Sequence, residues 1–302
     1  MLLKIDKMLM SDQSVFTIVN RQNGNLAFKL LWFDDNSYFD HIQRNNYYSL
    51  IWIRNGSGIV TADFSEHNFE KGSLFAFSPY QPFMVATKEK LGGIAFQFHP
   101  DFFCIHKHHK EVACHGVLFN NIYEPPFVRV SEAAASTFGM LAENMKTELQ
   151  NPELAGYELL VSYLKIFLIT ASRLRKEERG AVLPVSIYEK TPFVLQRLKE
   201  AIETDFRKRH AARDYAEALS ISVKALAKIT KRYFNKTPTE LISERIVIEA
   251  KRELYLTNKT IKEIAYELGY DDEYYFSRFF KINTDISPQT YRDTVGFAKG
   301  VA

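Results

Sequence analysis

The sequence IKEIAYELGYDDEYYFSRFFK, residues 261–281, contains two short helical patterns separated by a turn. Thr260 precedes the first pattern and Glu263 follows three residues later, which predicts a capping box at the start of a helix. Gly269 tolerates a positive φ and is therefore expected to end that helix. Asp271 is then expected to cap the next one. The segment thus predicts two short helices joined by a tight turn, which is the plan of a helix-turn-helix unit.

The second helix of this unit has one aromatic face and one polar face. Its aromatic residues fall at core spacing, and they are Tyr275, Phe276, Phe279 and Phe280. The residues left on or near the outer face are Tyr274, Ser277, Arg278 and Lys281. An arginine can donate two hydrogen bonds to guanine, and a lysine can neutralise phosphate. We therefore predict that the aromatic face holds the helix in place while its polar face meets DNA in the major groove.

A related pattern occurs about fifty residues earlier, so the region is an internal repeat. Residues 216–241 correspond to residues 265–291, with Pro238 matching Pro288. In the first copy Ser222 is expected to cap a helix over 223–233. We predict that Leu226, Ile229 and Tyr233 face inward and that the outer face carries Lys224, Ala227, Lys228 and Lys231.

The helix between the two copies is expected to begin at Thr237 and Pro238. Its apolar residues recur every four positions at Ile242, Ile246, Ala250 and Leu254, which predicts one buried face. A long, stiff helix here would hold the two units about one DNA turn apart, ~34 Å.

Residues 190–293 resemble the double helix-turn-helix domain of the AraC/XylS family of transcription regulators, and the stretch from Ile261 to Arg292 carries the signature of that family. The resemblance implies double-stranded DNA and RNA polymerase as partners. It assigns base or phosphate contacts to Lys224, Ala227, Lys228, Tyr274, Ser277 and Arg278. Three positions depart from the family pattern. Ser220 and Asn235 replace turn glycines, and Tyr274 replaces a serine.

Composition and charge are consistent with this interpretation. The chain has 302 residues, and from Lys190 onward it holds 21 Lys and Arg against 16 Asp and Glu, a net charge of +5. The other 189 residues hold 18 against 20, a net charge of −2, so the carboxyl-terminal part is the one suited to a polyanion. Because the sequence shows no membrane-spanning run and no export signal, we expect a cytoplasmic protein with no membrane partner.

The amino-terminal part reads as β structure. Residues 48–64 place two β-rich runs around Asn55-Gly56, which predicts a hairpin. GSLFAFSP (72–79) fits a glycine and proline strand motif of cupin barrels, and the order of strands before helices is similar to an AraC-type sensor. We therefore predict an α+β protein of two domains. These are a cupin-like β-barrel with a helical connector and an all-α double helix-turn-helix domain.

The predicted boundaries follow these patterns. Residues 1–127 form the sensor barrel, 128–182 the helical connector, 183–189 a linker, and 190–295 the DNA-binding domain. In the connector one apolar stripe is predicted to pack either on its own barrel or on a second copy of the chain as a homodimer. The stripe consists of Leu160, Leu164, Phe167, Leu168 and Ala171.

The function predicted from these patterns is that of a transcription regulator controlled by a small-molecule effector in the barrel, with no enzymatic activity and no cofactor. Two alternatives remain open. The first is a metal- or thiol-responsive regulator that uses a Cys/His cluster comprising Cys104, His106, His108 and Cys114, although its spacing matches no standard zinc site. The second is a cupin-type oxygenase. It is disfavoured because Ser49 and Phe83 stand where metal ligands are expected, and His41, His67 and His99 lie singly.

Overall fold

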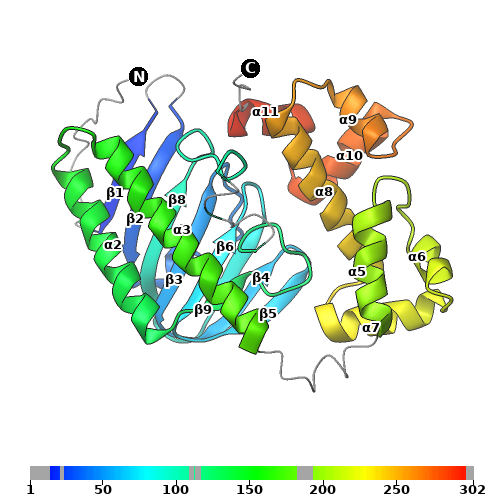
Figure 1. Cartoon of the computed structure of the whole chain (residues 1–302), viewed down its shortest axis with the longest axis horizontal. Coiled ribbons are helices and arrows are strands. Elements are labelled where there is room, and N and C mark those ends of the chain that lie inside the picture. Colours follow the sequence, from blue (N-terminus) through cyan, green and yellow to red (C-terminus); the bar gives the residue numbers. More distant parts are fainter. Residues whose placement is uncertain (1–13, 21–23, 109–111, 113–116, 182–192, 297–302) are drawn as a thin grey trace. The chain divides into compact units, whose positions relative to one another are not determined.

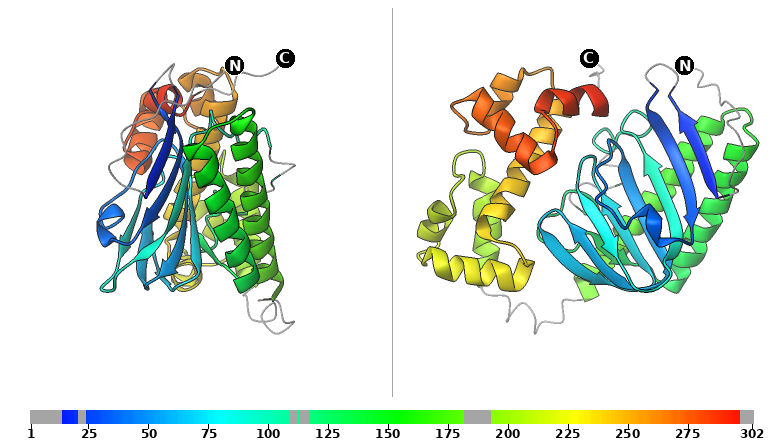
Figure 2. Two further views of the ribbon diagram at one scale, coloured as in Figure 1. Left: turned by 90° about the vertical axis from the view of Figure 1, so that its left-hand side faces the viewer. Right: turned by 180° about the vertical axis from the view of Figure 1, so that it is seen from behind.

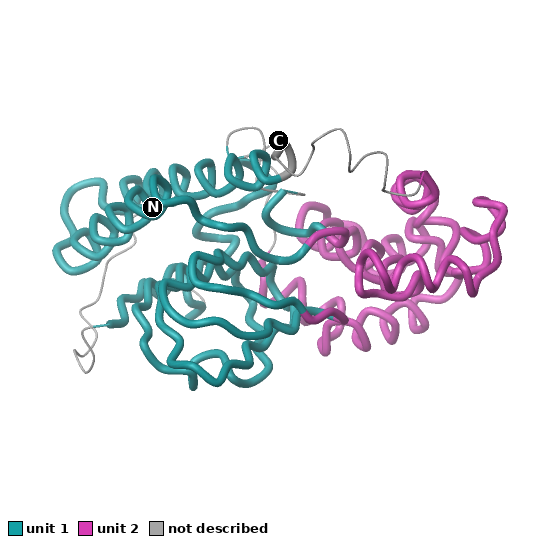
Figure 3. Tube along the Cα trace, turned by 90° about the horizontal axis from the view of Figure 1, so that it is seen from below, with its two compact units in different colours: residues 1–63, 67–121, 125–180 teal, residues 64–66, 122–124, 181–302 magenta. Residues whose placement is uncertain are grey.

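The computed structural model describes residues 14–20, 24–108, 112, 117–181 and 193–296 (Figure 1). The predicted linker, 183–189, lies outside this set. Contacts divide the chain into two compact units (Figure 3). The first consists of residues 1–63, 67–121 and 125–180, and the second of residues 64–66, 122–124 and 181–302. The first contains antiparallel sheets and two long helices, whereas the second is helical. The predicted α+β architecture with two domains is confirmed.

The first unit contains two antiparallel sheets. The larger has the strand order β1-β2-β8-β3-β6-β9. Its strands are β1 (Val15–Val19), β2 (Leu26–Phe33), β3 (Tyr48–Asn55), β6 (Ser73–Phe77), β8 (Gly92–Phe98) and β9 (Phe127–Arg129). The smaller has the order β5-β4-β7, with β4 (Gly58–Ala62), β5 (Ser65–Phe69) and β7 (Phe83–Ala86). A short 3-10 helix, η1, spans Asn36–Tyr38.

Two predictions for this unit are corrected. Within the described residues the strands form two sheets and no closed barrel. The predicted hairpin at Asn55-Gly56 is a turn, but β3 and β4 belong to different sheets. The turn packs against Lys90 and Leu91, and a Cβ added to Gly56 would lie 3.0 Å from the Lys90 carbonyl oxygen. The chain therefore passes from one sheet to the other at this point, and the sheets meet face to face.

The larger sheet separates two apolar cores. Between the sheets lie side chains from both, including Leu31, Ile51, Val60 and Phe83. The opposite face is covered by α2 (Glu132–Gln150) and α3 (Gly156–Ala181), as Figures 1 and 2 show. Every residue of the predicted α3 stripe is fully buried in this second core. The stripe therefore packs on its own sheet, and the predicted connector helices belong to the core of the first unit.

The second unit consists of short helices around one long helix. They are α5 (Phe193–Asp205), α6 (Ala212–Ala218), α7 (Val223–Phe234), α8 (Pro238–Leu256), α9 (Ile261–Glu267), α10 (Glu273–Thr284) and α11 (Pro288–Val295). The stripe predicted for α8, from Ile242 to Leu254, is buried. Thus α6 with α7, and α9 with α10, form the two predicted helix-turn-helix units on either side of α8. None of the described helices combines the length and apolarity needed to cross a membrane.

Candidate DNA interface

Helices α7 and α10, the second helices of the two helix-turn-helix units, both begin at a side-chain cap. At α7 the Ser222 side chain accepts a hydrogen bond from the Ala225 amide, as predicted. At α10 the cap is Asp272 rather than the predicted Asp271, and its carboxylate accepts from the amides of Tyr274 and Tyr275. Two adjacent aspartates offer the same chemistry, and the chain path in the turn decides which of them reaches the amides. An anionic cap also interacts favourably with the positive end of the α10 dipole.

The polar face of α10 is exposed as the spacing predicts. Phe276 and Phe280 are fully buried, while Tyr274 is 77% exposed. Arg278 and Lys281 are exposed as well, and Ser277 is half-buried. The prediction for Tyr275 is wrong, because this side chain is 64% exposed rather than inward. Residues 276 and 280 fix the buried direction, so position 275 points about 100° away from it around the helix.

The corresponding face of α7 carries three lysines. Leu226 and Thr230 are buried beneath the helix. Lys224, Lys228 and Lys231 are exposed, and Ala227 is half-buried between them. Tyr233, predicted to face inward, is 42% exposed.

The ammonium of Lys231 donates to the Asn235 carbonyl at 3.1 Å. This lysine therefore also counters the negative end of its own helix.

The two turns differ in a way that explains a departure noted in the sequence. Gly269 has φ 81° and Ser220 has φ 55°, so both are left-handed. A Cβ on Gly269 would overlap the carbonyl group of Arg207, in the segment that precedes α6. The second turn therefore needs glycine for space as well as for φ, whereas the first turn holds a serine. Asn235 ends α7 at φ 56°, a conformation that asparagine tolerates.

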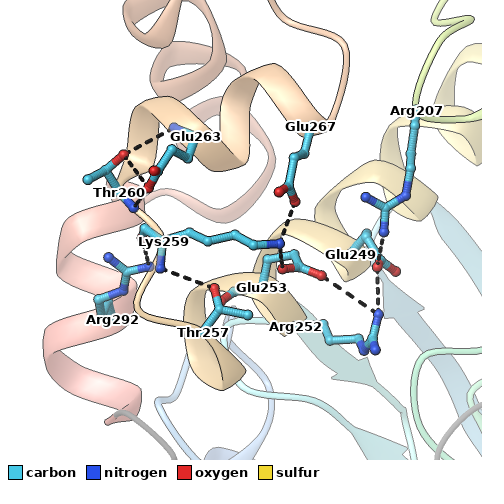
Figure 4. A network of polar contacts seen from close by, with 10 residues as sticks. All are labelled: Arg207, Glu249, Arg252, Glu253, Thr257, Lys259, Thr260, Glu263, Glu267 and Arg292. Carbon is cyan, nitrogen blue, oxygen red and sulfur yellow. Dashed lines mark hydrogen bonds and ion pairs between the residues drawn. The ribbon is translucent and has the colours of Figure 1, made fainter.

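Glu249 of α8 pairs with three arginines, of which Figure 4 shows Arg207 and Arg252. Its carboxylate lies 2.6 Å from Arg207, 3.1 Å from Arg245 and 2.7 Å from Arg252. The Glu249 side chain is only 5% exposed. Burial acts to raise its pKa, but the three guanidinium groups together outweigh burial and hold the pKa below its ordinary value. This network joins the segment before α6 to the centre of α8.

A second polar network joins α8 to the second helix-turn-helix unit, α9 with α10. Lys259 pairs with Glu253 of α8 at 2.9 Å and with Glu267 of α9 at 2.6 Å (Figure 4). Arg292 of α11 donates to the carbonyl oxygens of Leu254 and Lys259. The predicted capping box between Thr260 and Glu263 is present at the start of α9. These contacts fix how α9 leaves α8, and α9 in turn braces α10.

His210 lies between α5 and α6, in the segment before the first helix-turn-helix unit, and contacts the turn of the second helix-turn-helix unit. Its Nε2 is 2.9 Å from the Leu268 carbonyl oxygen, to which it donates as a neutral imidazole, and its ring centroid is 4.6 Å from that of Tyr270. Burial lowers the pKa of His210, and nearby carbonyl groups and Asp214 partly oppose this effect. Together with Arg207, this histidine packs the segment before α6 against the turn between α9 and α10.

The Cys/His cluster is only partly described by the structure. Cys104 is buried and its Sγ accepts from the Lys107 amide at 3.3 Å, and His108 stacks on Phe103. His106 is half-buried, and Cys114 lies outside the described residues. Across the described ranges, no group of three histidine, cysteine or acidic residues is arranged to hold a metal ion. His41 lies beside Asp40 and His99 beside Asp101, far apart in sequence.

Comparisons with known proteins agree with this geometry. A family described as a helix-turn-helix domain matches residues 215–294. The transcriptional activator Btr of Bacillus subtilis is 34% identical over 88 residues, which cover 29% of this chain and 17% of Btr. The activator RhaS of Citrobacter koseri is 25% identical over 171 residues, which cover 56% of this chain and 58% of RhaS. The chain thus spans less than two thirds of the length of either relative.

A solved structure is also similar. The crystal structure of an apo ToxT variant from Vibrio cholerae matches with a TM-score of 0.39 and 16% identity, over 90% of this chain and 99% of that one.

The repeated motif, its caps and the family match define a double helix-turn-helix DNA-binding domain in the second unit. The match of residues 215–294 and the activator relatives agree with the resemblance of this region to the AraC/XylS family of transcription regulators.

Proposed function

We propose that this protein is a sequence-specific, DNA-binding transcription regulator and that α7 and α10 are its recognition helices. The observation that carries the proposal is the repeated arrangement on these helices. In each, buried side chains fix one face against the domain, and exposed cationic side chains occupy the opposite face. Lys224, Ala227, Lys228 and Lys231 would meet DNA from α7, and Tyr274, Ser277, Arg278 and Lys281 from α10.

We further propose that the first unit binds a small-molecule effector and that the regulator acts on RNA polymerase as a homodimer without catalysing a reaction. Two packed sheets backed by helices supply a rigid frame on which a ligand could change how the second unit is presented. Activator homologues such as RhaS support the link to transcription.

The test is selection of a binding sequence from random DNA by the full chain, followed by titration of variants against the selected site. Arg278→Ala should weaken binding by about 1–3 kcal/mol and relax the preference at one base pair. Lys231→Ala should weaken binding to all sequences alike and reduce the salt slope by about one.

Lys71→Ala, at an exposed lysine of the first unit, controls for the change in net charge. If Arg278→Ala bound selected and random DNA as the parent does, α10 would not be a recognition helix.

A further inference from the structure

A row of polar side chains crosses the larger sheet on the face that meets the smaller one. Lys29 of β2 lies on the same face of the strand as Leu31 and Phe33, two and four residues further on, and these belong to the core between the sheets. In the strand register Lys29 lies opposite Gln97 of β8, and Gln97 lies opposite Ser49 of β3. Directly opposed residues in antiparallel strands point to the same face. These three side chains therefore lie side by side, and we call them the polar row.

Among the residues that the structure describes, one buried polar atom of the polar row has no hydrogen-bond partner. Gln97 is 3% exposed and Ser49 is 1% exposed. Gln97 Nε2 lies 3.4 Å from Ser49 Oγ, and Gln97 Oε1 is buried without a hydrogen-bond partner in the described part of the chain. Buried polar groups in folded proteins are nearly always paired, so an unpaired amide oxygen beside a lysine needs a reason.

Lys29 adds a positive charge to this row without a matching negative one. No carboxylate pairs with it in the ranges that the structure describes. Burial lowers the pKa of its ammonium group, so the surroundings disfavour the charge. Lys29 is only half-buried, and the row is thus reached from solvent at β2 while its other two members lie deep.

An anionic ligand would pair with the Gln97 amide and would also match the positive charge of Lys29. The two ends of a side-chain amide exchange by a half-turn. With the Gln97 amide turned, Ser49 donates to its oxygen, and its NH₂ group faces the ligand as a donor. Lys29 supplies a charge and further donors, a combination that suits a carboxylate. The next position in the row is Phe77, which stacks on Phe83 with ring centroids 3.9 Å apart. Buried aromatic side chains therefore continue the row beyond its polar end.

We propose that the polar row of Lys29, Gln97 and Ser49 binds the carboxylate of a small organic acid whose body is apolar. Naming this acid as the effector rests on the proposed regulatory function, whereas its binding does not require DNA and is measured separately. Sugars and neutral amides lack the charge that Lys29 requires and are excluded as ligands of the row.

The test uses the full chain without DNA. Benzoate, phenylacetate and octanoate are compared with benzamide, phenylacetamide and octanamide by thermal unfolding and calorimetry at neutral pH. At one hundred times Kd a ligand should raise the Tm of the unit that binds it by on the order of 5 °C. We expect at least one acid to do so and its matched amide to have no effect.

Two variants assign the effect to the row. Lys29→Met should weaken binding by roughly thirtyfold or more without lowering Tm in the absence of acid, since it removes a charge that the fold disfavours. Gln97→Glu places a carboxylate opposite Lys29, within reach of an ion pair, and should raise Tm and abolish the response to acids. Lys71→Met, at an exposed lysine, should bind acids as the parent does.

The outcomes separate this proposal from the proposed function. No response of the parent to any acid, or an equal response in Lys29→Met, would overturn the assignment of the polar row, whatever the DNA titrations show. A response to acids that is lost in Lys29→Met supports it, even where DNA binding fails and the regulatory function is refuted.

Discussion

Gly269 lies so close to Arg207 that a Cβ on the glycine would overlap the main-chain carbonyl of the arginine. These residues are far apart in the sequence. Gly269 lies in the turn between α9 and α10, and Arg207 lies between α5 and α6. The contact places the segment before the first copy of the motif against the turn of the second copy. It also shows why glycine remains at 269 while serine occupies position 220 in the equivalent turn.

Gly269→Ala should therefore destabilise the second unit. The left-handed conformation at φ 81° costs a non-glycine residue about 1–2 kcal/mol. The overlap with a rigid carbonyl adds a packing cost of about 1–3 kcal/mol. Ser220→Ala at φ 55° is the matched control and should change stability by less than about 0.5 kcal/mol. Urea unfolding of both variants checks this, and equal losses would rule out the close contact as the cause.

Glu249→Gln should lower the free energy of unfolding by about 3 kcal/mol, because three arginines lose their shared carboxylate in a buried position. Since the pKa of Glu249 is lowered in the folded state, its contribution is fully present above its ordinary value of 4.5 and is lost as pH falls through the folded value. The parent should therefore lose more stability on acidification than the variant does.

The control for this experiment is Glu267→Gln, whose carboxylate is 40% exposed. It should cost less than about 1 kcal/mol, as solvent-exposed pairs do. Chemical unfolding at pH 7 and pH 4 separates the two variants. A Glu249→Gln protein as stable as Glu267→Gln would mean that the network adds nothing beyond a surface pair.

His210 should make the second unit less stable below neutral pH. Burial lowers the pKa of this histidine below 6.5 in the folded state, so the unfolded chain binds a proton that the folded chain resists. The stabilising contribution is present above pH 6.5 and decreases as pH falls toward the folded pKa. His210→Gln keeps a donor for the Leu268 carbonyl and should remove this pH dependence.

His210 is the only histidine in residues 181–302, and the signal that is lost in His210→Gln identifies it among the eight histidines of the chain. An NMR titration of its ring gives the folded pKa. A folded pKa at or above 6.5 would contradict the burial seen in the structure.

Phe167 and Ile166 are adjacent in α3 and test how this helix packs. Phe167 is fully buried in the core beneath the larger sheet, whereas Ile166 is 46% exposed. Phe167→Ala should cost about 3–5 kcal/mol, and Ile166→Ala less than about 1 kcal/mol. Thermal unfolding at two protein concentrations provides the readout. A comparable loss in Ile166→Ala that depends on concentration would show that α3 packs on a second copy instead.

Much of the second unit could be predicted from the sequence because its signals are local. Thr237, Thr260 and Ser222 cap helices that begin one residue later, so a few neighbouring letters decide each boundary. The errors there concern which side chains of a helix face the core and which face solvent. The spacing predicts Tyr275 in the core with Phe276 and Phe280, but the burial of those two residues directs Tyr275 toward solvent.

The first unit was less predictable because its structure depends on distant pairings. The turn at Gly56 gives a strong local hairpin signal, yet contacts with Lys90 and Leu91 send the chain to another sheet. Lys29, Gln97 and Ser49 are separated by at least 20 residues from one another, and only the strand order brings them together. No local pattern could have identified them as one group.

The continuity of α8 has a consequence for the DNA sequences this chain can use. Each residue of an α-helix advances it by about 1.5 Å and turns it by about 100°. Because α8 runs unbroken from Pro238 to Leu256, gaining or losing one residue would swing α9 and α10 around the helix axis relative to α7. If α7 and α10 both bind DNA as proposed, the two half-sites are held at one spacing and one rotational phase, so base pairs inserted between them should weaken binding.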